Sequence, residues 1–220
     1  MTVSVKICGI VNDVIAHSAI DDSADMLGFV FFHRSPRHLP IEVARNVITS
    51  ARNYTETRAV KPKIVSVMVN PDDALLELIT EALSPDLIQL HGHENPERVR
   101  DIRQRFNTPL IKAISVSEAS DVVSASAYEP YVDYLMFDAK PPKGAELPGG
   151  VGARFDWSLM SHYQGEKPWF LAGGLNPDNV REAISLSKAP LVDVSSGVER
   201  APGLKDPSLI TQFITNAKQT

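Results

Sequence analysis

The stretch Val5-Lys6-Ile7-Cys8-Gly9 opens the unit of sequence that decides the fold. It reads as a strand, and it is followed by apolar residues at helical spacing over 13–24 and by an apolar run over 26–32. Two strands joined through a helix lie parallel in one sheet. Such a unit begins either an open doubly wound sheet or a closed barrel. No glycine-rich dinucleotide-binding fingerprint follows the first strand, which favours the barrel.

The same strand-and-helix unit recurs to the end of the chain. Three asparagine-proline pairs, beginning at Asn70, Asn95 and Asn176, each predict the N-cap of a helix followed by proline in its first turn. Eight strands that alternate with helices, without a linker or a shift in composition, predict an α/β fold: a single-domain (β/α)8 TIM barrel over residues 1–220. The further strands are expected at 64–69, 87–90, 110–114, 132–137, 169–172 and 191–194, and further helices at about 40–50, at 118–127 and from Asp206 onward.

The composition is that of an ordinary globular protein, with 43% hydrophobic and 22% charged residues. A net charge of -5 argues against a surface that binds nucleic acid or an anionic membrane, because either needs a basic patch. The apolar runs are too short to span a bilayer. The single cysteine excludes an internal disulfide, and no secretory leader is recognisable at the N-terminus, so the expected location is cytoplasmic.

Lys6 and Cys8 lie two residues apart on the first strand, so they share one face of it. Cys8 is either a small buried hydrophobic residue or a reactive thiol, and the strand alone leaves both open. On the eighth strand Asp193 shares the face of Ser195, and this strand closes a barrel against the first. Asp193 is therefore expected to neutralise Lys6 inside the barrel, whereas a Lys6 placed beside Cys8 would favour the thiolate.

Residues suited to chemistry follow the strands at one end of the predicted barrel. Active sites of such barrels lie at the carboxyl ends of the strands, so these residues are expected to share one rim. Glycine and serine residues after the seventh and eighth strands allow backbone N–H groups to approach a ligand, which predicts a phosphate site. Arg34, in the basic turn after the second strand, is expected to face solvent. The rim residues are Cys8, Arg37, His91, Asp138, Gly173, Gly174, Ser195, Ser196 and Gly197.

Seven short motifs run in order over nearly the whole chain. They are Lys6-Ile7-Cys8-Gly9-Ile10, Leu27-Gly28-Phe29-Val30-Phe31, Ser35-Pro36-Arg37, Gln89-Leu90-His91-Gly92, Phe155-Asp156-Trp157, Ala172-Gly173-Gly174-Leu175-Asn176-Pro177 and Val192-Asp193-Val194-Ser195-Ser196-Gly197-Val198-Glu199. Together they resemble the motifs of the phosphoribosylanthranilate isomerase family, whose members are single-domain eightfold barrels.

The resemblance implies a reaction, the Amadori rearrangement of N-(5-phosphoribosyl)anthranilate to 1-(2-carboxyphenylamino)-1-deoxyribulose 5-phosphate in tryptophan biosynthesis. It makes Cys8 the base that removes the C2 proton and Asp138 the acid that protonates the ring oxygen. It places Arg37 on the anthranilate carboxylate, and it implies that neither a cofactor nor a metal takes part. The implied phosphate ligands are Gly173, Gly174, Ser195 and Ser196, and Gly197 of the same turn is counted among the substrate-binding residues.

Two departures from the family pattern and two rival interpretations accompany this assignment. Val11 stands where the family usually has threonine, and Val151 where its glycine-rich loop more often carries a small polar residue. One rival is a barrel that binds a phosphorylated metabolite without turning it over, which would need neither Cys8 nor Asp138. The other is another phosphosugar isomerase or epimerase on the same barrel, some of which bind a metal, for which His33, His38, His91 and Asp138 could serve as ligands. In every case the expected partner is a small phosphorylated molecule, and the chain is expected to be a monomer or a homodimer.

Overall fold

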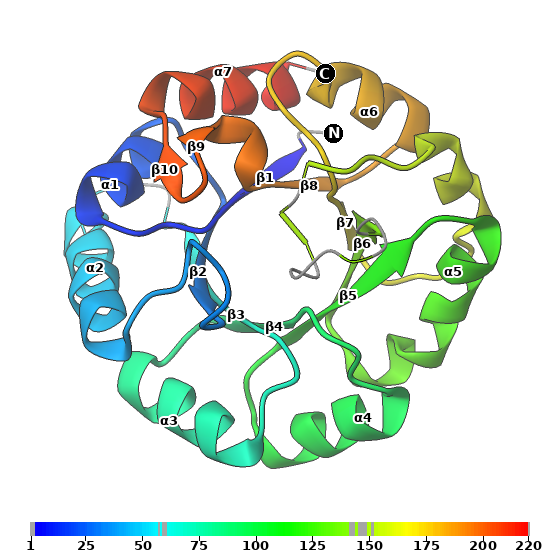
Figure 1. Ribbon diagram of the computed structural model, residues 1–220, viewed down its shortest axis with the longest axis horizontal. Coiled ribbons are helices and arrows are strands. Elements are labelled where there is room, and N and C mark those ends of the chain that lie inside the picture. The colour runs from blue at the N-terminus through cyan, green and yellow to red at the C-terminus, as the bar shows by residue number, and fades with distance from the viewer. Residues whose placement is uncertain are drawn as a thin grey trace.

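The computed structural model describes residues 3–56, 58, 61–140, 144, 149–150 and 152–219. Within this part of the chain, eight parallel strands close into a barrel in the order β1 to β8, and β8 pairs with β1 (Figure 1). The helices form a ring outside the strands. The (β/α)8 fold predicted from the sequence is confirmed.

The predicted strands agree with the observed ones to within two residues at each end. The barrel strands are β1 (Ser4–Cys8), β2 (Met26–Phe31), β3 (Lys63–Met68), β4 (Leu87–Leu90), β5 (Leu110–Val116), β6 (Tyr134–Ala139), β7 (Trp169–Leu171) and β8 (Leu191–Val194). The α-helices are α1 (Asp13–Asp21), α2 (Ile41–Tyr54), α3 (Asp73–Leu83), α4 (Pro96–Arg105), α5 (Ala119–Ser124), α6 (Val180–Ser187) and α7 (Pro207–Lys218). In the described residues, no helix has the length and apolar composition that crossing a membrane requires.

Apolar side chains fill two layers, one inside the barrel and one between the strands and the helices. All six residues of β2 are buried, which explains why this strand is one continuous apolar run in the sequence. Met26 and Val30 belong to the barrel interior, whereas Leu27, Phe29 and Phe31 pack in the outer layer under the helices. Alternation along each strand thus separates the interior, which carries the chemistry, from the packing that supports it.

Of the three predicted asparagine caps, the one at Asn95 is confirmed. Its side chain accepts a hydrogen bond from the Arg98 backbone N–H at 2.8 Å, and Pro96 is the first residue of α4. The cap predicted at Asn70 is wrong, because Asn70 adopts a left-handed φ of 47° and Asp72 caps α3 instead. Asn70 serves the turn, and its side chain accepts from the His93 N–H at 2.7 Å.

The cap predicted at Asn176 is also displaced. Its side chain accepts the N–H groups of Asp178 and Asn179 and closes a turn, so α6 starts only at Val180. Asp206, by contrast, caps α7 as expected, since its carboxylate accepts the Ser208 N–H at 2.8 Å.

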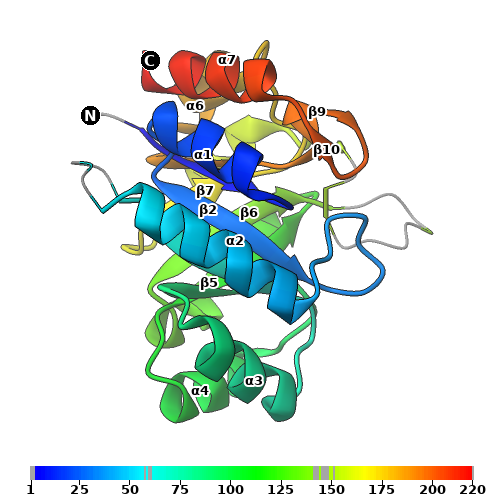
Figure 2. The ribbon, with the colours of Figure 1, turned by 90° about the vertical axis from the view of Figure 1, so that its left-hand side faces the viewer.

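Three further features differ from the regular repeat. The helix expected at 118–127 is divided into α5 and a 3-10 turn, η1 (Ala125–Ala127), which is followed by η2 (Glu129–Tyr131). The connection from β6 to β7 carries the 3-10 helix η3 (Trp157–His162), and Val151 of this connection lies outside the described residues. After β8 come a short 3-10 helix, η4 (Ser196–Val198), and an antiparallel hairpin of β9 (Glu199–Ala201) and β10 (Leu204–Lys205). In the side view this hairpin lies at the end of the barrel away from the labelled termini (Figure 2).

Closure of the barrel sets Lys6 of β1 directly against Asp193 of β8. Lys6 Nζ donates to Asp193 Oδ1 at 2.7 Å, and the Lys6 side chain is fully buried. The predicted neutralisation of the two charges is confirmed. Burial alone would lower the pKa of Lys6, but the Asp193 carboxylate opposes this and the net pKa lies above its usual value, so the lysine stays charged.

Removing one member of this pair should destabilise the barrel strongly. In Lys6→Met the Asp193 carboxylate loses its partner in the interior, and we expect the free energy of unfolding to fall by about 3–5 kcal/mol in urea denaturation. The double variant Lys6→Met/Asp193→Leu removes both charges and should recover most of that loss. An equal loss in the single and double variants would mean that packing, and not charge, accounts for the effect.

Candidate active site

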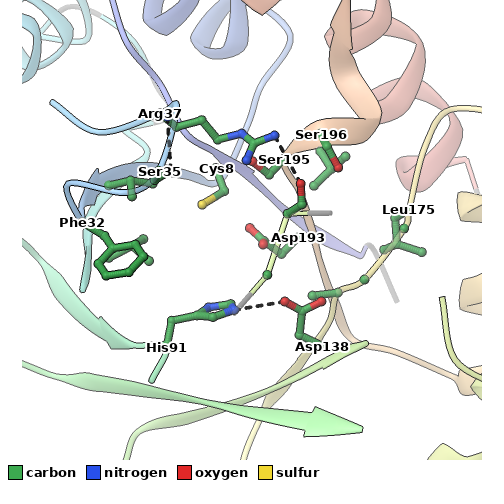
Figure 3. Close-up of a pocket in the computed structure, with 18 of the residues that line it drawn as sticks. Cys8, Phe32, Ser35, Arg37, His91, Asp138, Leu175, Asp193, Ser195 and Ser196 are labelled. Carbon is green, nitrogen blue, oxygen red and sulfur yellow. Dashed lines mark hydrogen bonds and ion pairs between the residues drawn. The ribbon is translucent and has the colours of Figure 1, made fainter. Parts of the chain in front are cut away.

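The carboxyl ends of the strands surround one pocket (Figure 3). Cys8 and Arg37 lie on one side of it, and His91 and Asp138 lie on the other. Gly197, also in the described part of the chain, lines an adjoining cavity that shares Arg37 with the pocket. The other predicted rim residues that line the pocket are Gly173, Gly174, Ser195 and Ser196.

Cys8 ends β1 and points into the barrel interior beside Lys6. Gly28 of β2 pairs with Cys8, and a Cβ atom at Gly28 would lie 3.0 Å from Cys8 Sγ and 3.1 Å from Lys6 Nζ. The absence of a side chain at Gly28 therefore lets the thiol and the ammonium share this space. Both predicted alternatives for Lys6 hold at once, since it pairs with Asp193 and also lies beside the thiol.

The charge state of Cys8 is set by opposing effects. Burial raises the pKa of the thiol most, the Lys6 ammonium lowers it, and the Asp193 carboxylate raises it again. The net pKa lies above the ordinary value of a cysteine. In the free protein the thiol therefore holds its proton at neutral pH, with a cation close by to stabilise the thiolate when it forms.

Asp138 is held by His91 across the pocket from Cys8. His91 Nε2 lies 3.0 Å from Asp138 Oδ2, and His91 Nδ1 lies 2.7 Å from Gln89 Nε2. Because the Gln89 amide donates to Nδ1, the ring proton sits on Nε2 and is donated to the carboxylate. Asp138 thus has one oxygen fixed by the imidazole, and Oδ1 is the oxygen that the histidine leaves free.

A buried ion pair holds the turn that carries His91. Lys112 Nζ donates to Glu94 Oε2 and to the Gly92 carbonyl oxygen, both at 2.9 Å, and Glu94 accepts the Gly92 N–H. The exposed fractions of the Lys112 and Glu94 side chains are 3% and 2%. These buried hydrogen bonds hold the backbone of the turn in place and thereby support the imidazole.

Gly173 follows β7 in a conformation that only glycine adopts readily, with φ of +86°. A Cβ atom there would lie 2.5 Å from the backbone nitrogen of Ala139 and 3.0 Å from Asp138 Oδ1. The backbone of this turn therefore passes directly over the carboxyl of Asp138. The other small residues at the pocket, on which the predicted phosphate site depends, are Gly174, Ser195 and Ser196.

Arg37 is buried and forms a two-pronged ion pair. Its Nε and Nη2 donate to Glu199 Oε1 and Oε2, each at 2.8 Å. Glu199 also accepts Lys205 Nζ at 2.6 Å. Burial opposes charge on these groups, yet the pKa of Arg37 is raised by Glu199, and the pKa of Glu199 is lowered by Arg37 and Lys205.

Sequence reasoning assigned no role to Glu199 and did not consider Lys205. A usable signal was present, because Pro202-Gly203 marks a turn that places these two residues on facing strands of a hairpin. Arg34 is exposed, as expected. His33 and His38 contact each other, with ring centroids 4.3 Å apart, and the described residues contain no group of three metal-ligating side chains placed to hold an ion.

The sequence matches the family described as N-(5'phosphoribosyl)anthranilate (PRA) isomerase over residues 5–216. The chain belongs to this family. The protein is accordingly an isomerase of tryptophan biosynthesis that converts N-(5-phosphoribosyl)anthranilate to 1-(2-carboxyphenylamino)-1-deoxyribulose 5-phosphate by an acid–base catalysed Amadori rearrangement. This activity, and not either of the two rival interpretations, is the one that the family carries.

Relatives of known sequence and structure agree with the assignment. The N-(5'-phosphoribosyl)anthranilate isomerase of Caulobacter sp. (strain K31) is 51% identical over 217 residues, which cover 99% of each chain. The structure of mutually generated monomers of the dimeric enzyme from Thermotoga maritima has a TM-score of 0.81 at 34% identity and covers 99% of this chain and 100% of its own. A complex of such an isomerase with reduced 1-(o-carboxyphenylamino)-1-deoxyribulose 5-phosphate has a TM-score of 0.80 at 35% identity, with the same coverage.

The raised pKa of Cys8 predicts slow alkylation at neutral pH. Only the thiolate reacts, so the rate with iodoacetamide should rise with pH and reach half its maximum above the value of about 8.5 typical of a free thiol. Glutathione, titrated under the same conditions, is the control. A midpoint below that of glutathione would show that Lys6 outweighs burial.

Replacing Gly173 by alanine should separate backbone strain from displacement of Asp138. A left-handed backbone costs an L-residue about 1–2 kcal/mol, and we expect this loss of stability in the control Gly144→Ala, where φ is +85° and no described atom lies within 4 Å of the added Cβ, and a larger loss in Gly173→Ala, where the Cβ also meets the backbone of Ala139. Only Gly173→Ala should also lower kcat, by roughly 100-fold, because it moves the Asp138 carboxyl. Equal kcat values in the two variants would contradict this.

Proposed function

We propose that Cys8 and Asp138 carry out the two proton transfers of the isomerisation, with Cys8 as the base and Asp138 as the acid. The observation that supports this most is their placement, since both line one pocket but enter it from different sides of the barrel. A sugar held between them would meet a thiol on one side and a carboxyl group on the other. An aldose-to-ketose shift needs two such groups of opposite function.

The proposed isomerisation moves protons and electrons in three steps. Asp138 gives a proton to the ring oxygen, the bond between this oxygen and C1 breaks, and the nitrogen lone pair forms the C=N bond of a Schiff base. The Cys8 thiolate then takes the C2 proton, and the C2–H electrons form the C1=C2 bond of an enolamine. Gain of a proton at C1 and loss of the C2 hydroxyl proton give the ketone. Cys8 releases its thiol proton to solvent when the substrate binds and ends protonated by the C2 proton. Asp138 ends ionised and takes one proton from solvent before the next turnover, so the number of protons is conserved.

The surroundings of Cys8 suit a base that ionises only with substrate bound. The Schiff base carries a positive charge next to C2, which favours a thiolate nearby, and the Lys6 ammonium favours it further. Burial raises the pKa of the thiol and leaves only 7% of the residue exposed. Cys8 would then be a weak nucleophile in the free enzyme and an effective base in the complex.

We propose that His91 positions the acid. By holding Oδ2 of Asp138, the imidazole directs the remaining oxygen, Oδ1, to the substrate. Gln89 sets the histidine tautomer, and Lys112 with Glu94 sets the turn beneath it. The carboxyl is thereby limited to one orientation, and orientation of a catalytic group is a large part of its effect.

The two ends of the substrate would be anchored by different loops. Arg37 is proposed to hold the anthranilate carboxylate, because a planar guanidinium matches a carboxylate. The small residues after β7 and β8, including Gly197 in the adjoining cavity, are proposed to hold the phosphate through backbone N–H groups. The complex of the related isomerase with a reduced carboxyphenylamino sugar phosphate supports a ligand with these two anionic ends.

Three further expectations remain proposals. We propose that residues 1–220 form one domain and that the enzyme acts in the cytoplasm. The dimer described for the Thermotoga maritima relative supports the expectation of a monomer or a homodimer without deciding between them.

Two substitutions, each of which removes one ionisable group, test the acid–base assignment. Cys8→Ala and Asp138→Asn should each lower kcat by about 10²- to 10⁴-fold, because each removes one proton-transfer group. The measurement is the fluorescence decay of freshly made phosphoribosylanthranilate. Arg34→Gln, at an exposed site, should turn over like the wild type. Equal turnover in all four proteins would refute the mechanism.

A further inference from the structure

The geometry around Arg37 assigns roles to Glu199 and Lys205. Glu199 occupies one edge of the guanidinium, formed by Nε and Nη2, through two hydrogen bonds of 2.8 Å. The exposed fractions of the Arg37 and Glu199 side chains are 6% and 3%. Such a fork fixes the plane of the guanidinium and the direction in which its outer edge points.

The outer edge of Arg37 is directed to the pocket. A Cβ atom added at Gly150, which lines the pocket, would lie 2.7 Å from Arg37 Nη1. Among the described residues no hydrogen bond involves Nη1, and the remaining bond of Nη2 is a long one of 3.4 Å to the Gly150 carbonyl oxygen. In the described part of the chain, the N–H groups of Nη1 are therefore available to a planar anion, which could also replace Gly150 as the partner of Nη2.

Arg37 and Glu199 alone would form a neutral pair, which attracts an anion weakly. Lys205 changes this balance, because its fully buried ammonium lies 2.6 Å from Glu199 Oε1. The three groups, two cations and one anion, carry a net charge of +1. Burying a second cation is unfavourable, and burial does lower the pKa of Lys205. The extra positive charge is unfavourable in the free protein, and a bound anion would compensate it.

Lys205 also contacts the turn that follows β8. Its Nζ donates to the Ser195 carbonyl oxygen at 3.2 Å, so one side chain contacts both the partner of Arg37 and the turn after β8. The β9–β10 hairpin supplies Glu199 and Lys205 and thereby ties the two proposed anion sites together.

We propose that Glu199 and Lys205 are positioning residues that act through Arg37: Glu199 sets the guanidinium plane, and Lys205 preserves the positive charge that recognises the carboxylate on the aryl ring of the substrate. The inference rests on the proposed function, in which Arg37 binds that carboxylate. It goes further by assigning the selectivity for a carboxylated aryl amine to a buried three-charge group and not to Arg37 alone.

The test compares two ligands by calorimetry. One is reduced 1-(o-carboxyphenylamino)-1-deoxyribulose 5-phosphate, and the other is the same compound with phenyl in place of carboxyphenyl. Lys205→Met makes the group neutral and should weaken binding of the carboxylated ligand at least tenfold relative to the phenyl ligand. In turnover, KM should rise by a larger factor than kcat falls, because Lys205 lowers the pKa of Cys8 less than Lys6 does and does not touch Asp138.

The double variant Glu199→Gln/Lys205→Met restores the net charge to +1 and keeps one acceptor oxygen beside the guanidinium, so it should bring the ratio of the two affinities back to within about threefold of the wild type. Arg200→Gln is the control. Arg200 lies on the same hairpin, but its guanidinium pairs with Asp206 and not with Glu199, so the ratio of the two affinities should not change. A merely structural role for Lys205 would weaken the binding of both ligands equally in Lys205→Met, and a role that does not depend on net charge would leave the ratio unrestored in the double variant. Either result overturns the inference.

Failure of the inference is distinguishable from failure of the proposed function. If Arg37→Met abolishes the preference for the carboxylated ligand while Lys205→Met retains it, Arg37 binds the carboxylate without help from Lys205, and only the inference is wrong. If Arg37→Met keeps the preference, the carboxylate lies elsewhere, and the proposed role of Arg37 is wrong together with the inference.

Discussion

The parallel pairing of β1 with β8 is the constraint on which the rest of the structure depends. It closes the barrel, opposes Lys6 to Asp193, and brings the end of β1, with its cysteine, next to the turns that follow β8. Because every strand runs the same way, all carboxyl ends meet around one pocket, and residues far apart in the sequence become neighbours. Cys8 and Asp138 are 130 positions apart by their numbers, yet they share a pocket because of this closure.

Three buried charge groups then give the site its shape. Lys6 with Asp193 lies beneath Cys8, Lys112 with Glu94 supports the turn of His91, and Glu199 with Lys205 holds Arg37. Each is costly to bury and contributes little to net stability, as is usual for interior ion pairs. What each provides is a fixed orientation for one functional side chain. The stability of the fold comes mainly from the apolar layers inside and outside the strands.

The sequence was informative where a pattern repeats and uninformative where contacts are distant. Strand bounds followed from apolar runs, and the Lys6–Asp193 pair followed from side-chain parity on two strands that close a barrel. The cap at Asn70 failed because the same asparagine-proline pair also suits a left-handed turn. The bond between Arg37 and Glu199 joins residues 162 positions apart, and no local pattern in the chain indicates it.

The central claim is that a thiol and a carboxyl group act on neighbouring atoms of one bound sugar. The most direct measurement is a crystal structure of this protein with reduced 1-(o-carboxyphenylamino)-1-deoxyribulose 5-phosphate. The account predicts Cys8 Sγ beside C2 and an Asp138 oxygen within about 3 Å of the oxygen that had closed the ring. It also predicts the aryl carboxylate on Arg37 and the phosphate at Gly174 and Ser196. A ligand bound in the opposite direction, or one that leaves either Cys8 or Asp138 out of reach, would contradict the account.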